Sequence, residues 1–380
     1  MTERLYYKDQ YIKNFTAHVV SCTENGGKFE VVLDKTAFFP EGGGQPGDTG
    51  FICGVRVSDT VERGEEVIHI CESAVNEGEN AECKLDFDKR FLNMQLHSGE
   101  HIFSGVAHSL CGVDNVGFHM GETSVTVDFN SVITDEELKK IEILSNEAVF
   151  ANIPIEAIYP DDGELENYDY RSKKEIKGQV RLTKIGDVDL CACCGTHVAF
   201  TGEIGMIKAT SMMNYKSGVR VTLQIGRRAL DDYMEKNESV NRISALLKAK
   251  TGEVAEAVER VQAQLYEARL NYNLLKKELF AAKAQGISGD FCCEFDSAGQ
   301  ADDARIFCDL LADKVKIAAV FSGDDENGYK YAVSSRTEDV RAIGKELNAA
   351  CSGRGGGKPD MVQGSVAATR EEIEKFFENR

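Results

Sequence analysis

The sequence lacks the features of a membrane or exported protein. Its 380 residues contain no apolar run long enough to cross a bilayer as a helix. Residues 1–8 have neither the basic nor the apolar part of a signal peptide. Apolar residues make up 42% and charged residues 28%, as in ordinary globular proteins, and a chain of this length should form about two to four domains. We therefore expect a cytoplasmic protein with no membrane partner.

Positive charge is also scarce. The formal net charge of −19 disfavours nucleic-acid binding, because a phosphate backbone is repelled at long range. A local exception is the stretch 171–184, which contains a single acid, Glu175. Its basic residues are Arg171, Lys173, Lys174, Lys177, Arg181 and Lys184. This stretch fits either a solvated loop or a local contact surface for nucleic acid.

The cysteines do not form the pattern of a disulfide framework. Twelve occur, and most are scattered singly, as expected of reduced thiols that fill core volume in a cytosolic protein. One close group, Cys191, Cys193 and Cys194, is followed by a histidine at metal-ligand spacing, His197. This group is therefore a candidate source of metal ligands.

Two short motifs together supply a candidate metal site. His97 and His101 are four residues apart in a segment of helical periodicity, so both rings can lie on one helix face. Cys193 and His197 add a thiolate and a third imidazole. Three nitrogens and one sulfur form the tetrahedral set that suits Zn²⁺. We predict one zinc ion per chain if the two motifs meet in space.

Three functions are compatible with such a site. The string from His97 to His101 matches the H-x-x-E-H motif of inverzincin metallopeptidases, in which Glu100 would be the general base. That interpretation leaves Cys193 and His197 unexplained. Alternatively, the zinc supports ester hydrolysis by polarising a substrate or activating water. The third interpretation is an RNA-binding module with a structural zinc, since a closed set of protein ligands is typical of structural sites.

The stretch 36–50 is rich in glycine. It contains three successive glycines, Gly42, Gly43 and Gly44, directly before Gln45. A turn between strands requires fewer glycines than this. No helix and no Lys-Ser/Thr pair follows, as a phosphate-binding loop would need. A structural turn and a ligand-binding segment both remain open.

A second glycine-rich stretch, residues 352–360, contains Arg354 and Lys358. Glycines with two cations suit backbone and charge contacts with phosphate. A flexible loop between a helix and a strand is the alternative.

The pattern of apolar residues predicts an α+β protein in four parts. Short strands separated by turns over residues 1–88 indicate a small β-barrel or sandwich. Residues 89–226 combine helices with an antiparallel sheet. Residues 227–285 are helical, with an apolar 4-3 repeat typical of a helical hairpin or a dimeric coiled coil. Residues 286–380 alternate helices and strands as a small α/β domain with a glycine-rich loop.

The motifs together resemble the editing domain of alanyl-tRNA synthetase and its freestanding relatives, the AlaX alanyl-tRNA editing proteins. The stretch 38–48, the histidine pair and the motif 193–197 occur in the order found in that family. Residues 354–364 are similar to the signature of the synthetase's C-terminal domain, which also occurs in DHH-type phosphoesterases. The similarity covers nearly the whole chain. It implies the long AlaX form, with a barrel, a zinc-binding editing domain, a helical hairpin and a C-terminal domain.

The resemblance implies a trans-editing hydrolase that cleaves the ester of mischarged tRNA(Ala). The implied substrate is chiefly Ser-tRNA(Ala), with Gly-tRNA(Ala) as an alternative. The implied zinc ligands are His97, His101, Cys193 and His197. Thr36 lies where the family uses a threonine hydroxyl to recognise the extra hydroxyl of serine, a contact that alanine would leave unmade.

The resemblance also suggests roles for residues near these motifs. Thr36, Gln45 and Glu100 are the candidate catalytic residues, with Glu100 as a base or as the partner of an imidazole. The substrate pocket is expected to include Gly42, Gly43, Gly44 and His119. The residues expected to contact tRNA are Arg171, Lys173, Lys174, Lys177, Arg354 and Lys358. A homodimer through the helical or C-terminal domain is a further expectation.

Overall fold

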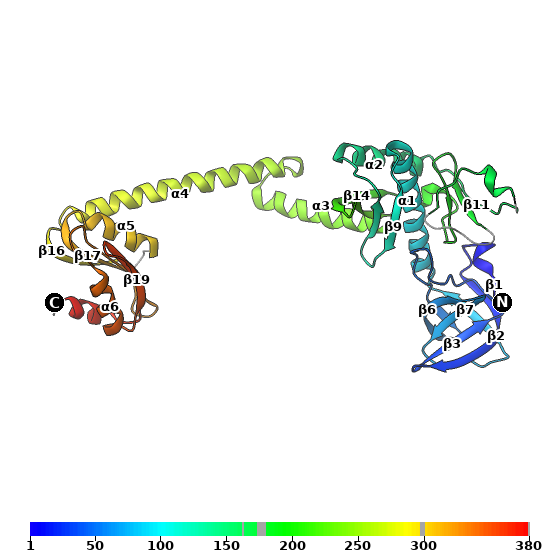
Figure 1. Cartoon of the computed structure of the whole chain (residues 1–380), viewed down its shortest axis with the longest axis horizontal. Helices are drawn as coiled ribbons and strands as arrows, with labels where there is room; N and C mark the ends of the chain where they lie inside the picture. The colour runs from blue at the N-terminus through cyan, green and yellow to red at the C-terminus, as the bar shows by residue number, and fades with distance from the viewer. Residues whose placement is uncertain (162, 173–179, 297–300, 379–380) are drawn as a thin grey trace. The chain divides into compact units, whose positions relative to one another are not determined.

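The structure, a computed structural model, contains helices and strands in both of its compact units, so the α+β class is confirmed. The units are Met1–Arg242 and Ile243–Arg380, and Figure 1 shows their elements. The residues that the structure describes are 1–161, 163–172, 180–296 and 301–378. The finer division into four domains stays a prediction.

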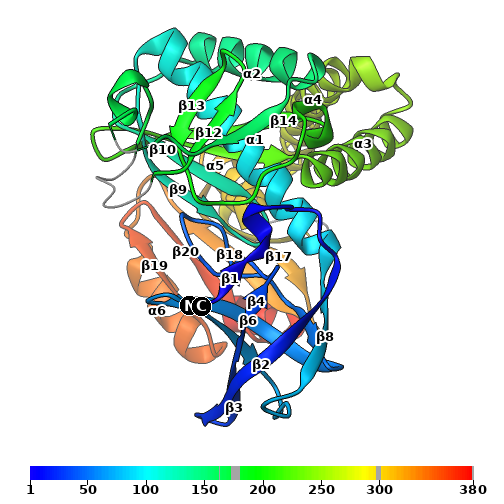
Figure 2. The same ribbon diagram turned by 90° about the vertical axis from the view of Figure 1, so that its right-hand side faces the viewer.

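Six strands near the N-terminus close into a barrel, in the order β2-β3-β7-β6-β5-β8. They are β2 (Asn14–Asn25), β3 (Lys28–Leu33), β5 (Gly50–Ile52), β6 (Val55–Arg63), β7 (Glu66–Cys71) and β8 (Asn80–Leu85). Core residues such as Val31, Leu33 and Ile52 are fully buried, as expected where alternate side chains of a strand face the interior. Figure 2 shows the barrel strands near the start of helix α1 (Phe87–Cys111).

A tight turn joins two neighbouring strands of the barrel. Strands β5 and β6 pair antiparallel. Between them Cys53 and Gly54 have φ angles of 49° and 77°. Two successive residues with positive φ form the tight turn that joins the strands of a hairpin. A cysteine at such a position is uncommon, so the turn left little signal in the sequence.

A short parallel pair connects the N-terminus to the beginning of the glycine-rich stretch. Strand β1 (Glu3–Arg4) pairs with β4 (Lys35–Thr36), and the 3-10 helix η1 (Leu5–Tyr7) follows β1. The next residues, Gln10 and Tyr11, bond to the loop after strand β13 (Asp189–Ala192). The N-terminal segment therefore bridges the barrel and that loop.

Helix α1 is buried along most of its length. It ends at Gly112, whose φ of 66° is the left-handed conformation usual for a glycine after a helix. Gly99 allows close packing, since a Cβ there would lie 2.6 Å from the Ile225 side chain. The helix that carries His97 and His101 is thus held by the core and does not lie on the surface.

The rest of the first unit consists of two sheets and helix α2 (Asp135–Phe150). The four-stranded sheet has the order β14-β15-β10-β9, and the three-stranded sheet has the order β11-β12-β13. Their remaining strands are β9 (Asn115–Met120), β10 (Val125–Phe129), β11 (Ile155–Ile158), β12 (Leu182–Ile185), β14 (Ile207–Tyr215) and β15 (Gly218–Ile225). The short 3-10 helices are η2 (Leu165–Asn167) and η3 (Thr201–Ile204). Thr134 caps α2 in a capping box with Glu137.

The second unit has a five-stranded sheet in the order β16-β17-β18-β20-β19. Its strands are β16 (Gly289–Asp296), β17 (Val315–Asp324), β18 (Gly328–Ser334), β19 (Arg354–Lys358) and β20 (Met361–Val366). Its helices are η4 (Thr251–Glu253), α4 (Val254–Ala284), α5 (Ala301–Leu311), α6 (Arg341–Ala350) and α7 (Arg370–Glu378). Helix α3 (Arg227–Leu247) contains the boundary between the units. None of the helices in the described ranges is long and apolar enough to cross a membrane.

The helices predicted for residues 227–285 are confirmed as α3 and α4. Along α4 the apolar 4-3 repeat includes Val258, Leu265 and Leu275, which are 38%, 52% and 65% exposed. Pairing of these helices within one chain or between two chains stays a prediction.

The prediction of a glycine-rich loop at residues 352–360 was wrong. Residues 354–358 form strand β19, which pairs antiparallel with β20 at the edge of the sheet. Glycine weakens most strands, which is why the sequence suggested a loop. Here Gly355 lets Tyr331 pack closely, since a Cβ at Gly355 would lie 2.8 Å from the Tyr331 hydroxyl.

The barrel predicts a specific dependence of stability on pH. His69 is fully buried, and burial lowers the pKa of its imidazole from 6.5 to about 4. The unfolded chain therefore binds the proton more readily, and stability that is present above pH 6.5 is lost as the pH falls toward 4. Between pH 7 and pH 5 we expect the free energy of unfolding to fall by about 2 kcal/mol more in wild type than in His69→Gln.

Urea denaturation followed by circular dichroism at the two pH values measures this difference. His18→Gln, which removes an exposed imidazole from the same barrel, is the control. Equal losses in wild type and His69→Gln would contradict the assignment.

Candidate metal centre

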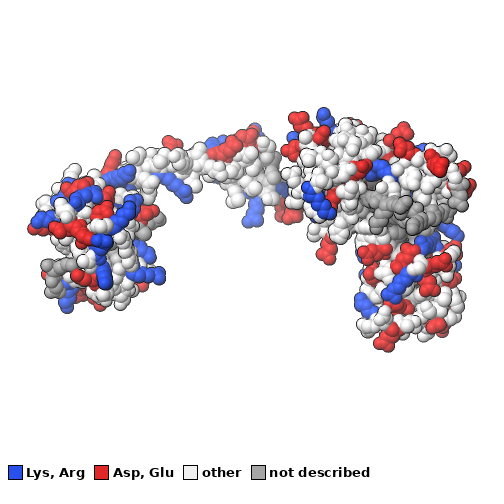
Figure 3. Space-filling model, viewed as in Figure 1, with Lys and Arg blue, Asp and Glu red and all other residues white. Residues whose placement is uncertain are grey.

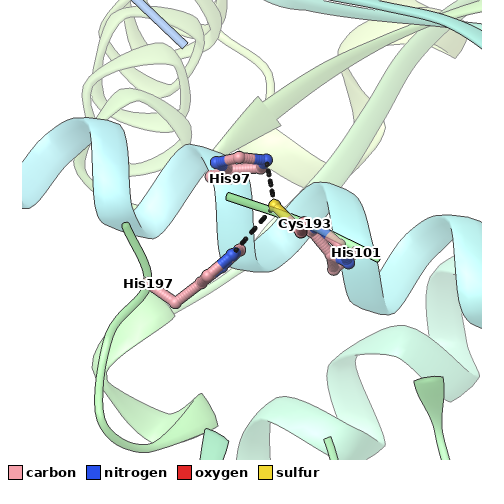
Figure 4. A group of neighbouring side chains, drawn as sticks. All are labelled: His97, His101, Cys193 and His197. Atoms are coloured by element: carbon pink, nitrogen blue, oxygen red, sulfur yellow. Dashed lines mark hydrogen bonds between the residues drawn. The ribbon is translucent and has the colours of Figure 1, made fainter. Parts of the chain in front are cut away.

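The structure brings the two predicted motifs together in one buried group. Helix α1 presents His97 and His101 from successive turns, and the loop after β13 adds Cys193 and His197 (Figure 4). One ligand atom from each residue lies within 4.8 Å of the others. The three imidazoles are 2–3% exposed, and only Cys193 is partly exposed. Segments almost one hundred residues apart thus form one site.

The distances within this group fit a small tetrahedral metal. Cys193 Sγ lies 3.5 Å from His97 Nε2 and 3.4 Å from His197 Nε2. Tetrahedral Zn²⁺ with its usual bonds to sulfur and nitrogen would separate such ligands by about 3.5 Å. The donor set, one sulfur and three imidazole nitrogens, is also one that zinc prefers. The group is therefore compatible with a metal ion.

Gln45 determines which nitrogen of His97 can bind a metal. Its Nε2 donates to Thr196 Oγ1 at 2.8 Å, and its Oε1 accepts the Thr196 backbone N–H at 3.1 Å. His97 Nδ1 lies 3.0 Å from the same Oε1. Because Oε1 can only accept, Nδ1 must carry the proton, and the lone pair is on Nε2. That lone pair is directed at Cys193.

The other two imidazoles are oriented in the same way. His101 Nδ1 lies 2.8 Å from Asp189 Oδ2, and His197 Nδ1 lies 3.2 Å from Ser98 Oγ. Metal-binding histidines usually place the second ring nitrogen against such an outer partner. All three rings therefore have an outer partner on Nδ1, a strong indication of a metal centre.

The charges of the group favour a thiolate at Cys193. Burial opposes its ionisation, but the neighbouring imidazoles, His97 and His101 foremost, hold the pKa of the thiol well below its ordinary value. Burial lowers the pKa of His197 to about 3, so this ring is neutral. Burial also acts to lower the pKa of His101, but Cys193 and Asp189 raise it well above its ordinary value. A metal ion would take the place of that proton on binding.

The loop that carries Cys193 and His197 is held by Arg181. The Arg181 guanidinium donates to the carbonyl oxygens of Cys193 at 2.8 Å and Gly195 at 3.1 Å. A Cβ at residue 195 would lie 2.1 Å from the His97 ring, so only glycine fits there. Gln10 Oε1 accepts the backbone N–H of His197. Arg181, which belongs to the basic stretch of the sequence, is thus 5% exposed and supports the metal-binding loop.

The glycine-rich stretch forms a tight turn beside the same group. Gly42 and Gln45 exchange two backbone hydrogen bonds of 3.0 Å, and Gly43 and Gly44 have φ angles of 60° and 88°. Two positive φ angles define a turn that strongly favours glycine. The ring of Phe118 stacks on His97 at 5.4 Å and packs against Gly44. The turn therefore positions Gln45 and Phe118 against one metal ligand.

Three other predicted residues have different surroundings. Thr36 is fully buried, and its hydroxyl lies 2.8 Å from His69 Nε2. Glu100 is 1% exposed and accepts hydrogen bonds from Ser104 at 2.6 Å and from Asn115. His119 is exposed on β9, next to Phe118, which points to the opposite face of the strand. The roles of Thr36, Glu100 and His119 stay predictions.

The residues predicted to contact tRNA fall into three groups. Arg171 forms an ion pair with Asp189 at 2.8 Å, and its side chain is 16% exposed. Arg354 and Lys358 are exposed on β19. Lys173, Lys174 and Lys177 lie outside the described residues. A role in tRNA binding stays a prediction for all six.

Several residues of the site were not predicted from the sequence. They are Gln10, Ser98, Phe118, Asp189 and, as a support of the loop, Arg181. None is part of a recurring spacing, and each reaches the site through tertiary packing. The sequence signal for two of them was their closeness to the predicted motifs. Ser98 lies between the two histidines, and Asp189 lies four residues before Cys193.

Comparison with protein families gives three matches. Residues 2–89 match the model for class II tRNA synthetases (A), and residues 180–244 match the second additional domain of threonyl and alanyl tRNA synthetases. Residues 288–379 match the DHHA1 domain. The second of these segments contains Cys193 and His197.

Individual relatives align along the whole chain. The alanyl-tRNA editing protein AlaX-L of Pyrococcus horikoshii is 29% identical, covering 98% of this chain and 96% of the relative. The chain is thus similar to an alanyl-tRNA editing protein along nearly its whole length. A second such protein, Aarsd1 of Danio rerio, is 26% identical over the same shares of both chains. The alanine–tRNA ligase of Pyrococcus abyssi is 31% identical over 99% of this chain but only 43% of the ligase. The resemblance to alanyl-tRNA editing proteins that the motifs suggested is thus confirmed.

Adjacent glycines of the turn allow a matched test of its contact with Phe118. Gly43→Ala and Gly44→Ala both introduce a side chain at positive φ, but only the Cβ at residue 44 would meet Phe118, at 2.7 Å. We expect Gly44→Ala to destabilise the protein by about 1–3 kcal/mol more than Gly43→Ala, because overpacking forces neighbours apart. Urea denaturation of both variants measures the difference, and equal destabilisation would contradict the packing.

Proposed function

We propose that the protein is a zinc-dependent deacylase that hydrolyses the ester bond of mischarged Ser-tRNA(Ala), with Gly-tRNA(Ala) as an alternative substrate. Relatives called alanyl-tRNA editing proteins that align with nearly the whole chain support an editing function. The observation that supports the zinc site most directly is the set of three imidazoles whose Nδ1 atoms all face outer partners. Outer partners of this kind fix the tautomer and the orientation of metal-binding imidazoles.

The residues present fit a zinc ion. His97, His101, Cys193 and His197 would hold it, and Gln45, Asp189 and Ser98 would orient the imidazoles. When bound, zinc supplies a Lewis acid that can polarise an ester carbonyl or lower the pKa of a water molecule to about 7. Gln45, predicted as catalytic, would then act by positioning His97.

Thr36 is proposed to discriminate serine from alanine. His69 Nδ1 faces the carbonyl oxygen of Val31 at 2.9 Å and therefore carries a proton, so His69 Nε2 accepts the proton of the Thr36 hydroxyl. The Phe38 backbone N–H donates to the same hydroxyl oxygen at 3.1 Å. One lone pair of Thr36 is left to accept a hydrogen bond from the serine hydroxyl. Since Thr36 is fully buried, a substrate reaches its hydroxyl only when neighbouring side chains move.

The proposed macromolecular partner is tRNA(Ala). The net charge is −19, and acidic and basic side chains are interspersed on the face shown in Figure 3. Binding therefore has to depend on local cations, such as Arg354 and Lys358, and has to weaken as salt rises. A homodimer through α4 or the C-terminal region and a cytoplasmic site of action belong to the same proposal.

A tRNA-binding module with a structural zinc is the second candidate. The observation in its favour is the complete set of four protein ligands, which leaves no position for water in a tetrahedral site. For a metallopeptidase no such observation exists in the described part of the chain. Glu100, the base in that interpretation, accepts hydrogen bonds from Ser104 and Asn115.

A deacylation assay tests the proposed function. We expect purified protein to accelerate hydrolysis of Ser-tRNA(Ala) without ATP, to spare Ala-tRNA(Ala), and to lose this activity when a chelator removes the metal. The reason is that zinc held by these residues would supply the Lewis acid for the ester, and the chelator would remove it. Release of labelled serine from tRNA, with and without chelator, is the measurement.

Two variants sharpen the assay. His97→Ala should abolish both zinc binding and hydrolysis. Glu100→Gln should keep zinc bound, and it would abolish all activity, with unstructured peptides cleaved by wild type, if Glu100 were the sole base of a metallopeptidase. Hydrolysis at the uncatalysed rate by zinc-loaded wild type, with tRNA still bound, would refute the deacylase and favour the structural zinc.

A further inference from the structure

Arg171 lies beside the metal-ligand group, although its place in a basic stretch of the sequence suggested a contact surface for nucleic acid. Its Nε donates to Asp189 Oδ1 at 2.8 Å, while the other oxygen of Asp189 faces His101 Nδ1 at 2.8 Å. A continuous chain of contacts therefore leads from Arg171 through Asp189 to the ligand His101. Both oxygens of the carboxylate are engaged, which restricts its rotation.

The same arginine balances two buried acids. The side chain of Asp189 is 1% exposed, and Glu100 is also 1% exposed. Burial opposes the charge of Arg171, but Asp189, Cys191 and Glu100 raise the pKa of its guanidinium above its ordinary value. Two uncompensated carboxylates in this environment would be strongly unfavourable, because buried charges require partners.

The backbone of Arg171 is also fixed beside the metal-binding loop. Its N–H donates to the Leu190 carbonyl at 2.8 Å, and its carbonyl accepts the Ala192 N–H at 2.9 Å. Arg171 thus forms a parallel bridge with Cys191, two residues before Cys193. Main chain and side chain both place it at the edge of the site.

We propose that Arg171 is a positioning residue of the metal centre: it holds Asp189 in the orientation in which His101 presents Nε2 to the ion. The inference rests on the proposed function, since it concerns the same zinc site. It replaces a tRNA contact as the main role of Arg171, because a side chain that is paired and 16% exposed offers little charge to a phosphate. Glu100 belongs to the same charge-balanced cluster as Asp189.

The test measures zinc retention directly. Zinc-loaded full-length protein is mixed with a chromogenic chelator, and the rate of zinc transfer is followed for wild type, Arg171→Gln, Arg171→Lys and Asp189→Asn. Lys184→Gln is the matched control, because Lys184 lines the same cavity of about 820 Å³ as Arg171 and Asp189 and carries the same charge. Binding of uncharged tRNA(Ala) is measured in parallel.

We expect Arg171→Gln and Asp189→Asn each to release zinc about 10-fold faster or more, as loss of an outer partner usually does. The double variant Arg171→Gln/Asp189→Asn, measured in the same way, should release zinc little faster than either single variant, because both substitutions act through one contact. Arg171→Lys should lie between Arg171→Gln and wild type. Lys184→Gln should retain zinc like wild type, and tRNA binding by Arg171→Gln should be unchanged.

Other results would overturn the inference. If Arg171→Gln retains zinc like wild type but binds tRNA more weakly, Arg171 acts as a surface cation and does not position the metal centre. The absorption spectrum of the cobalt-loaded variants separates a changed ligand geometry from a general loss of folding, and an unchanged spectrum in Asp189→Asn would also contradict the proposal. If wild type binds zinc and deacylates tRNA while Arg171→Gln behaves identically, only this inference fails. If wild type binds no zinc, the proposed function fails with it.

Discussion

Gln45 is the side chain on which the arrangement of the candidate metal centre depends, because one buried amide contacts both halves of the site. Its oxygen faces His97 on helix α1 and accepts the backbone N–H of Thr196, while its nitrogen donates to the Thr196 hydroxyl. The amide comes from a glycine turn of the barrel, so three segments of the chain meet at one group. An unpaired amide at this fully buried position would be costly, which makes the arrangement specific.

A buried ion pair reinforces this contact. Arg90, at the start of α1, binds Asp48, three residues after Gln45, and also donates to the carbonyl oxygen of Ala37 at 2.5 Å. The two charged side chains are 1% and 2% exposed. Removing one partner of such a pair typically costs about 3–5 kcal/mol, because the other charge is left buried. The barrel turn and the histidine helix are therefore joined at two points, and the metal-binding loop is added to this frame by Arg181 and Gln10.

The residues of the metal centre were predictable where they follow a local rule. The spacing of His97 and His101 follows from helical geometry, and Cys193 and His197 stand at metal-ligand spacing. Their outer partners follow no such rule. Gln45, Asp189 and Ser98 bond to histidines that are 52, 88 and 99 residues away in the sequence, so only the folded chain identifies them. Charge was misleading for the same reason, since Arg171 and Arg181 are bonded to groups of the site.

The fold shows the same division between local and tertiary signals. The capping box at Thr134 and the long periodic helices were predictable, whereas the short strands β9, β11 and β13 were not expected. Residues 354–358 form a strand because β20 and Tyr331 accommodate the glycines, which the local sequence does not reveal.

X-ray absorption at the zinc edge of the purified protein tests the central claim most directly. The account predicts one sulfur at about 2.3 Å and three nitrogens at about 2.0 Å around a single zinc ion. A coordination shell of two or more sulfurs, or one made only of light atoms, would contradict a centre built from Cys193, His97, His101 and His197.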